Sequence, residues 1–268
     1  MNDRVRAVSY GGGVQSTALL VLAAQGKIDF KTFLFSNVGD DSEHPATIEY
    51  VNEIAKPFAA EHGVELVELH RVMRDGTSET LWQRLNKEDS RSLDIPVRMS
   101  NGSPGNRRCT ADFKIKVVGK ELKRRRATED DPALLALGIS TDEIERAKPG
   151  IDQRDPYQER TYPLLDLGMD RDACKRTIAA AGIPVPPKSS CFFCPFHDSR
   201  AWRELRDETP ELFEKAVTLE NTLNARRDRL GKDHVYLTRH AVPLDRAIHE
   251  VPPLFDGLDG CDSGHCFT

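Results

Sequence analysis

The stretch AVSYGGGVQSTALLVLAAQG, residues 7–26, decides the fold that the sequence predicts. An apolar, strand-like run leads into three consecutive glycines, and a helical run that ends at Gly26 follows them. A corner between a strand and a helix N-terminus presents backbone N–H groups and the positive end of the helix dipole, which together bind phosphate. Glycine lets the backbone approach a ligand closely and adopt left-handed dihedral angles. The stretch therefore predicts a phosphate-binding corner; the alternative is a turn that only joins strand to helix.

Strand-like and helical patterns alternate beyond this corner. Strands are expected at 4–10, 30–37, 64–69 and 132–140, and helices at 14–26, at 44–63 with Pro57 kinking or dividing it, and from Asp170 to Gly182. This alternation predicts an α/β fold with a doubly wound, mostly parallel, Rossmann-like sheet covered on both faces. We expect a nucleotide-binding domain over 1–190. A helical, cysteine-rich extension over 191–268, with a long helix or helix pair at 198–230, is expected to pack on it.

Composition narrows the class of protein. The 268 residues are 38% hydrophobic and 30% charged, which is typical of a folded globular chain, and the net charge of −5 gives no global sign of nucleic-acid or membrane binding. No apolar run approaches the roughly 20 residues that span a bilayer, and no signal peptide is evident. We therefore expect a cytoplasmic protein, in which six cysteines indicate a metal site or redox chemistry more than structural disulfides.

The glycine corner differs from the two commonest phosphate motifs, because it lacks the lysine of a P-loop and the last glycine of G-x-G-x-x-G. GGGVQS resembles instead the S-G-G-x-D-S loop of the N-type ATP pyrophosphatases and the phosphoadenylylsulfate (PAPS) reductases. Gly11 stands for the first serine and Gln15 for the aspartate. Further segments that resemble this family follow in its order, at 36–51, 107–122, 137–149, 162–187 and 191–196. The sequence is thus identified as a member of the adenine nucleotide α-hydrolase-like (PP-loop) superfamily, in its PAPS reductase-like family, with a HUP-type fold over about residues 5–200.

This resemblance implies a nucleotide site at the ends of the first two strands. It would hold ATP, or PAPS or adenylylsulfate (APS), with Mg²⁺ neutralising the phosphates. The residues expected to bind the nucleotide are Ser9, Gly11, Gly12, Gly13, Gln15, Ser16, Thr17, Asn37 and Asp40. For the segment 36–51, which contains Asn37 and Asp40, the alternative is an acidic loop that caps a helix. Lys114 and Arg108, which lie near Cys109, are expected to take part in catalysis.

The cysteines carry the second expectation. Cys191 and Cys194 are two residues apart, a spacing that lets two thiolates bind one metal centre from a single turn. In the family branch that carries a [4Fe–4S] cluster, a Cys-Cys pair near Cys109 completes the set, and here Arg108 occupies one of those two positions. The resemblance implies Cys109, Cys191 and Cys194 as ligands. The fourth ligand is expected from the tail, as Cys266 or alternatively Cys261, or else one iron is open. Zinc, a disulfide and plain thiols remain alternatives.

Three other features bear on function. The tail GCDSGHC resembles the nucleophile segment of PAPS reductases, which makes Cys261 a candidate nucleophile. The run Arg124–Arg126 would meet a nucleic-acid backbone or form a solvated helix face. Cys174 is expected to be a buried small hydrophobe.

The sequence therefore predicts an enzyme of one of two kinds. The first is an ATP pyrophosphatase and sulfurtransferase, similar to the DndC-like proteins of DNA phosphorothioation and the tRNA thiolases. It would adenylate a DNA or RNA acceptor and take sulfur from a donor such as a cysteine desulfurase. The second is a PAPS or APS reductase that releases sulfite. A nucleotide-binding module without turnover is the third reading, since Gln15 replaces the family's aspartate.

Overall fold

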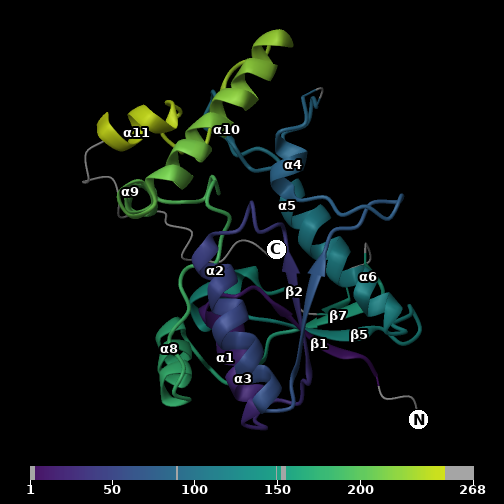
Figure 1. The fold of residues 1–268 in the computed structure, drawn as a ribbon. Coiled ribbons are helices and arrows are strands. Elements are labelled where there is room, and N and C mark those ends of the chain that lie inside the picture. The colour runs from purple at the N-terminus through teal and green to yellow at the C-terminus, as the bar shows by residue number, and fades with distance from the viewer. Residues whose placement is uncertain (1–3, 89, 149, 152–154, 251–268) are drawn as a thin grey trace. The chain divides into compact units, whose positions relative to one another are not determined.

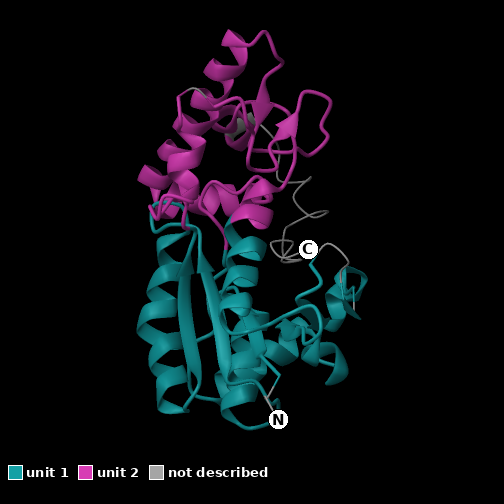
Figure 2. Cartoon of the chain, turned by 90° about the vertical axis from the view of Figure 1, so that its right-hand side faces the viewer, with its two compact units in different colours: residues 1–71, 113–189, 268 teal, residues 72–112, 190–267 magenta. Residues whose placement is uncertain are grey.

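The computed structural model describes residues 4–88, 90–148, 150–151 and 155–250 (Figure 1). The chain forms two compact units, and each is made of two stretches of sequence (Figure 2). Among the described residues, the first consists of 4–71 and 113–189, and the second of 72–112 and 190–250.

The first unit is built on a six-stranded sheet. Its strands are β1 (Arg6–Tyr10), β2 (Thr32–Asn37), β3 (Glu65–His70), β5 (Ala133–Leu137), β6 (Gly150–Ile151) and β7 (Gln158–Thr161). They lie in the order β3-β2-β1-β5-β7-β6, and every neighbouring pair is parallel except β6–β7. The chain winds outward from β1 to β3 and then returns to the other side of β1 with β5, so the winding direction switches between β1 and β5.

Helices cover both faces of this sheet. One face packs against α1 (Val14–Ala24), the α2–α3 segment and α8 (Arg171–Ala180), and the other against α6 (Lys116–Arg124) (Figure 1). The strand side chains alternate accordingly, since Val8 and Tyr10 join the first core and Ala7 joins the second. The α7 helix (Pro163–Asp166) follows β7. The prediction of a doubly wound, mostly parallel α/β sheet is confirmed.

The helix expected at 44–63 is continuous but uneven. It consists of α2 (Pro45–Tyr50), a π-helical turn η1 (Val51–Ala55) and α3 (Lys56–Glu61). Pro57 has no N–H to donate to the preceding turn, and the wider turn directly before it accommodates that loss. A second π-helical turn, η2 (Ala111–Ile115), separates α5 (Arg108–Thr110) from α6.

The second unit is mainly helical. It contains α4 (Leu81–Leu85), α5, α9 (Ser199–Glu208), α10 (Pro210–Arg229), α11 (Leu244–Glu250) and a two-stranded antiparallel ribbon of β4 (Arg98–Met99) and β8 (Val235–Tyr236). The α9–α10 pair corresponds to the helix pair expected at 198–230, and the Asp198 side chain caps α9 by accepting from Ala201 N at 2.7 Å.

The passage between the units at Ser189–Ser190 lies beside the boundary expected at 190–191, but the second unit also takes in 72–112. Those residues pack against later segments of the chain. The Trp82 ring lies 5.5 Å from Phe192 and 5.6 Å from Phe193 between centroids, and Arg226 Nη1 donates to Lys87 O at 2.8 Å. Across the residues that the structure describes, no helix is long and apolar enough to cross a membrane.

Candidate functional site

The three glycines form the corner between β1 and α1, as expected. Gly12 has φ +74°, which is the left-handed region, and a Cβ atom on it would lie 3.0 Å from Cγ2 of Thr47 and 3.4 Å from Cγ2 of Val51. Both the backbone conformation and the surroundings therefore require glycine at this position.

The first turn of α1 has the character of an anion site. Gly13 is the N-cap residue and has no side chain to cap the helix, and the first turn contains no acidic residue. The first intrahelical bond runs from Thr17 N to Gly13 O at 3.0 Å. The amides of residues 14–16 precede this bond, so their N–H groups and the positive end of the helix dipole are directed at whatever lies before the helix.

Two of the hydroxyls expected to contact a nucleotide make hydrogen bonds within the β1–α1 corner. Ser16 Oγ donates to Gly13 O at 3.0 Å, and Thr17 Oγ1 shares a 3.0 Å hydrogen bond with Tyr10 OH. Tyr10 is fully buried, and this burial raises the pKa of its phenol above its usual range. Ser9 is buried within β1. Ligand contacts by Ser9, Ser16 and Thr17 stay predictions.

The end of β5 adds a further glycine to the corner. A Cβ atom on Gly138, the residue after β5, would lie 3.0 Å from Ser16 N and 3.1 Å from the carbonyl carbon of Gln15. The ends of β1 and β5 thus both meet the first turn of α1 through glycine. These are the two strands between which the winding direction switches, where open α/β sheets bind their ligands.

Arg171, the first residue of α8, brings a positive charge to the same turn. Its Nη1 donates to Gln15 Oε1 at 3.3 Å, and its backbone N donates to Asp142 Oδ2 at 2.6 Å. The amide of Gln15 accepts this hydrogen bond as a neutral group, whereas an aspartate at this position would bring a negative charge to the same turn.

The connector that ends the first unit also reaches the corner. Ser189 Oγ donates to Gly11 O, and Tyr50 OH donates to Pro184 O at 2.7 Å. The Cβ atom of Ser189 would lie 3.5 Å from a Cβ on Gly13. The residue placed against the glycines is therefore small, and it is polar.

Asn37 and Asp40 organise the loop after β2. Asn37 Oδ1 accepts from Gly39 N at 2.8 Å, and its Nδ2 donates to Asp40 Oδ1 and to Glu68 Oε1, both at 2.7 Å. The amide of Asn37 is thus fully used in holding the turn. A direct contact of Asn37 or Asp40 with a nucleoside stays a prediction.

Lys114 is buried beside the same loop. Its Nζ lies 3.8 Å from Oε1 of Glu43, and both side chains are less than a tenth exposed. Burial raises the pKa of Glu43, and the Lys114 ammonium opposes that rise. Ser36 Oγ holds the neighbouring backbone by donating to Phe113 O at 2.5 Å.

Cys109, Cys191 and Cys194 all belong to the second unit. Cys191 and Cys194 lie in a turn closed by Cys194 N donating to Cys191 O at 3.1 Å, and the two residues between them, Phe192 and Phe193, are buried. The Cys109 and Cys191–Cys194 segments approach each other through Arg107, whose guanidinium lies 5.0 Å from the centroid of the Phe196 ring.

The described residues do not assemble the expected metal centre. Among residues 4–250, apart from the gaps at 89, 149 and 152–154, no three His, Cys, Asp or Glu side chains are grouped to hold a metal ion. Cys261 and Cys266, the expected nucleophile and fourth ligand, lie outside the described residues. The cysteine ligand set stays a prediction. Cys174 is fully buried in the first unit, as expected, and burial raises the pKa of its thiol to about 12.

The basic residues singled out in the sequence lie in different units and have different partners. Arg108, in the second unit, is 59% exposed, and its Nη1 donates to Ser92 Oγ at 3.1 Å. In the first unit, Arg124 pairs with Glu121 at 2.7 Å, and Arg125 bridges Glu121 and Glu65 at 2.7 and 2.8 Å. Two of the three charges in the Arg124–Arg126 run are thus met by carboxylates of the same unit, which favours the solvated-face interpretation.

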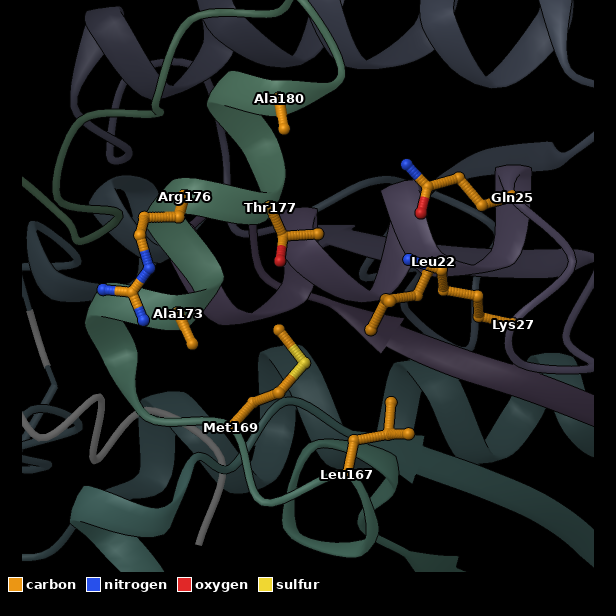
Figure 3. A pocket seen from close by; sticks show the side chains of 9 residues that line it. All are labelled: Leu22, Gln25, Lys27, Leu167, Met169, Ala173, Arg176, Thr177 and Ala180. Carbon is orange, nitrogen blue, oxygen red and sulfur yellow. The ribbon is translucent and has the colours of Figure 1, made fainter.

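A cavity of about 510 Å³ lies in the first unit, away from the glycine corner (Figure 3). It is bounded by the C-terminal end of α1, the loop before α8 and α8 itself, with Leu22, Leu167 and Met169 as its apolar wall and Lys27 and Arg176 as its cations. The phosphate-type corner is at the opposite end of α1, one helix length of roughly 16 Å away.

Four residues of the glycine corner had no place in the site predicted from sequence: Thr47, Gly138, Arg171 and Ser189. Glu43, which pairs with Lys114, had none either. A glycine directly after a strand was a signal for Gly138. Arg171 and Ser189 reach the corner from distant parts of the chain, and no local pattern marks them.

Comparison with known proteins adds little. No protein-family model matches the sequence, and no curated protein matches it. The chain resembles the solved structure of the U34-tRNA thiolase NcsA from Methanococcus maripaludis with its [4Fe-4S] cluster. The identity is 16% and the TM-score 0.43, over 83% of this chain and 72% of that one. A likeness of this size carries no argument about activity.

Proposed function

We propose that the chain is an ATP pyrophosphatase of the PP-loop type that activates an oxygen for replacement by sulfur. The observation that carries this proposal is the glycine corner, where Gly12 at φ +74° and Gly138 both leave room for a ligand's phosphates to approach backbone amides. The site lies at the switch point of the sheet, where this class of fold binds nucleotides.

The surrounding residues suit a triphosphate. The uncapped first turn of α1 offers amides to phosphate oxygens, and Arg171 adds a guanidinium beside Gln15. Lys114 supplies a second cation at the end of β2. Mg²⁺ would be carried by the phosphates of the nucleotide, since the described residues offer no metal-binding group of their own.

The reaction proceeds in two displacements. An acceptor oxygen attacks the α-phosphorus of ATP, the bond to the bridging oxygen breaks, and pyrophosphate leaves with its negative charge stabilised by amides and cations. A hydrosulfide then attacks the adenylated centre, and AMP leaves with the original oxygen. Sulfur enters at the oxidation level of sulfide, so neither displacement needs an oxidant or a reductant.

The sulfur chemistry rests on the cysteines. We propose Cys109, Cys191, Cys194 and Cys266 as ligands of a [4Fe–4S] cluster, supported by the C-x-x-C spacing and by thiolates being the donors that such clusters take. The described residues do not form this group, and Cys266 lies outside them. A nucleic-acid acceptor, a catalytic role for Cys261 or Arg108 and a cysteine desulfurase as sulfur donor belong to the same proposal.

The experiment is a product analysis. The full-length chain, prepared without oxygen, is incubated with Mg²⁺, ATP labelled at the α-phosphorus, sulfide, and either tRNA or duplex DNA. We expect labelled AMP and an equal amount of pyrophosphate, dependent on one acceptor. ADP and phosphate as products would contradict the proposal.

Two further results would replace it with the other interpretations. Release of sulfite from PAPS or APS, with thioredoxin as reductant, would assign the chain to the reductases. Tight ATP binding without any turnover in the presence of both acceptors would indicate a nucleotide-binding module.

A further inference from the structure

A buried carboxylate in the connection between β2 and α2 has a partner for only one of its two oxygens. Glu43 is 1% exposed and lies in the connection between β2 and α2. Its Oε1 lies 3.8 Å from Lys114 Nζ, whereas its Oε2 is buried and accepts no hydrogen bond. An ionised oxygen removed from water without a donor costs free energy, so such an atom calls for an explanation.

A second unsatisfied atom lies in the helix that follows this connection. Thr47 is fully buried in α2, and its Oγ1 makes no hydrogen bond. The Cγ2 atom of the same side chain lies where a Cβ on Gly12 would come within 3.0 Å. The unsatisfied hydroxyl therefore belongs to the residue that packs directly on the phosphate-type corner.

The chemistry of these atoms selects the group they would bind. A metal ion is disfavoured, because Lys114 already places a positive charge on the same carboxylate. A phosphate is disfavoured by the charge of Glu43 itself. A neutral hydroxyl group fits both atoms, since it donates to the carboxylate oxygen and exchanges a hydrogen bond with a threonine hydroxyl.

We infer that Glu43 and Thr47 recognise the ribose hydroxyls of the bound nucleotide and so select ribonucleotides over deoxyribonucleotides. The inference rests on the proposed function, because it assumes a nucleotide at the glycine corner. The position is appropriate, since β2 lies next to β1 and an acidic residue beyond the second strand binds ribose in related α/β folds. The Lys114 ammonium, 3.8 Å away, favours the ionised form of Glu43, and an ionised acceptor strengthens the hydrogen bond it accepts.

The first test uses the wild-type chain alone. Dissociation constants are measured by calorimetry for ATP, 2′-deoxyATP and 3′-deoxyATP in the presence of Mg²⁺. A hydrogen bond to a charged group corresponds to about 10- to 100-fold in affinity, so at least one deoxy analogue should bind about tenfold or more weakly than ATP.

The second test uses two nearly isosteric variants. Thr47→Val removes an unsatisfied buried hydroxyl, so its melting temperature should equal or exceed that of the wild type, while its discrimination against a deoxy analogue falls. Glu43→Gln replaces the charged acceptor with a neutral one, which should reduce the ratio below that of the wild type. Glu49→Gln, an exposed carboxylate in the same helix, is the matched control and should keep the wild-type ratio.

The outcomes separate this inference from the function it rests on. If the wild type binds ATP and both deoxy analogues equally, ribose recognition is overturned and the proposed ATP site stands. If the wild type discriminates but both variants retain the full ratio, the assignment to Glu43 and Thr47 is overturned. If ATP does not bind at all, the proposed function fails and this inference with it.

Discussion

Gly138 packs so closely on Ser16 that no larger residue fits at position 138. A Cβ atom there would lie 3.0 Å from the backbone nitrogen of Ser16. Since that nitrogen belongs to the first turn of α1, the contact couples the end of β5 to the proposed phosphate site.

Gly138→Ala should therefore displace the first turn of α1 and weaken ATP binding at least tenfold. We also expect a loss of about 1–3 kcal/mol in the free energy of unfolding, which is the range for overpacking. Gly119→Ala is the control. It lies within α6 with 3.9 Å to its nearest neighbour, and alanine should stabilise the helix by about 0.5–1 kcal/mol. Calorimetry and urea unfolding measure both effects, and unchanged ATP affinity in Gly138→Ala would contradict the placement of the site.

Gly12→Ala should abolish measurable ATP binding. Alanine is strained at φ +74° and its Cβ would press on Thr47. Gly26→Ala is the matched control, because Gly26 has a similar φ of +69° but open space around it. Both variants should lose about 1–2 kcal/mol from backbone strain, and only the first should lose the ligand. Equal ATP binding by the two variants would show that the corner does not hold the phosphates.

Glu220 makes the stability of the second unit depend on pH. Its Oε2 accepts from Leu237 N at 2.6 Å and its Oε1 from Leu244 N at 2.8 Å, while burial raises its pKa to about 7. An acid whose pKa is higher in the folded than in the unfolded state stabilises the fold while it is protonated. For Glu220 this contribution is complete below pH 4.5, its ordinary pKa, and is lost as the pH rises through about 7. The loss over this range should amount to about 3 kcal/mol at most.

Hydrogen exchange at the amides of Leu237 and Leu244, followed from pH 5 to 8, measures this loss after correction for intrinsic exchange. Glu220→Gln should flatten the profile, and Glu214→Gln, an exposed position on the same helix, should leave it as in the wild type. An identical slope in Glu220→Gln would assign the pH dependence to another group.

Arg125 should act through structure rather than through nucleic acid. Its hydrogen bonds are the main cause of the lowered pKa of Glu65; for Glu121, Arg124 contributes first and Arg125 second. A lowered carboxyl pKa gives stability that is present at neutral pH and lost as the pH falls through the folded-state value. Arg125→Ala should therefore lower the free energy of unfolding by about 1 kcal/mol at pH 7, a modest loss because Glu65 is half exposed. The loss should be smaller near pH 3, because protonated carboxyls no longer pair with the arginine.

Arg126→Ala, at the exposed neighbouring residue, is the comparison for this effect. Filter binding of tRNA and DNA at two salt concentrations completes the test. A large drop in nucleic-acid binding by Arg125→Ala, with stability unchanged, would restore the arginine run as a binding surface.

Metal content tests the cysteine proposal. Protein prepared without oxygen should absorb near 400 nm and contain iron and acid-labile sulfide, and Cys191→Ser and Cys194→Ser should each remove both. Cys174→Ser should retain the cluster, because that thiol is buried in the other unit. Stoichiometric zinc in a colourless protein would contradict an iron–sulfur centre and support the zinc alternative.

Sequence patterns captured the elements whose signals are local. The β1–glycine–α1 corner shows itself through an apolar run, three glycines and a helical run, and Asp170 caps α8 as expected by accepting from Ala173 N at 2.6 Å. By contrast, β7 is the polar run QERT, held by its pairing with β5 and β6, and it has no apolar alternation to reveal it. The Glu43–Lys114 pair joins residues far apart in the chain, which no spacing rule detects.

The interleaved make-up of the two units has a consequence for synthesis on the ribosome. Residues 72–112 leave the ribosome before β5, the strand that pairs with β1 in the first unit. The rest of the second unit, against which residues 72–112 pack, begins only at residue 190. We expect the nascent chain to hold Leu81, Leu85 and Ile95, all buried in the finished protein, in contact with water or a chaperone until translation is well advanced.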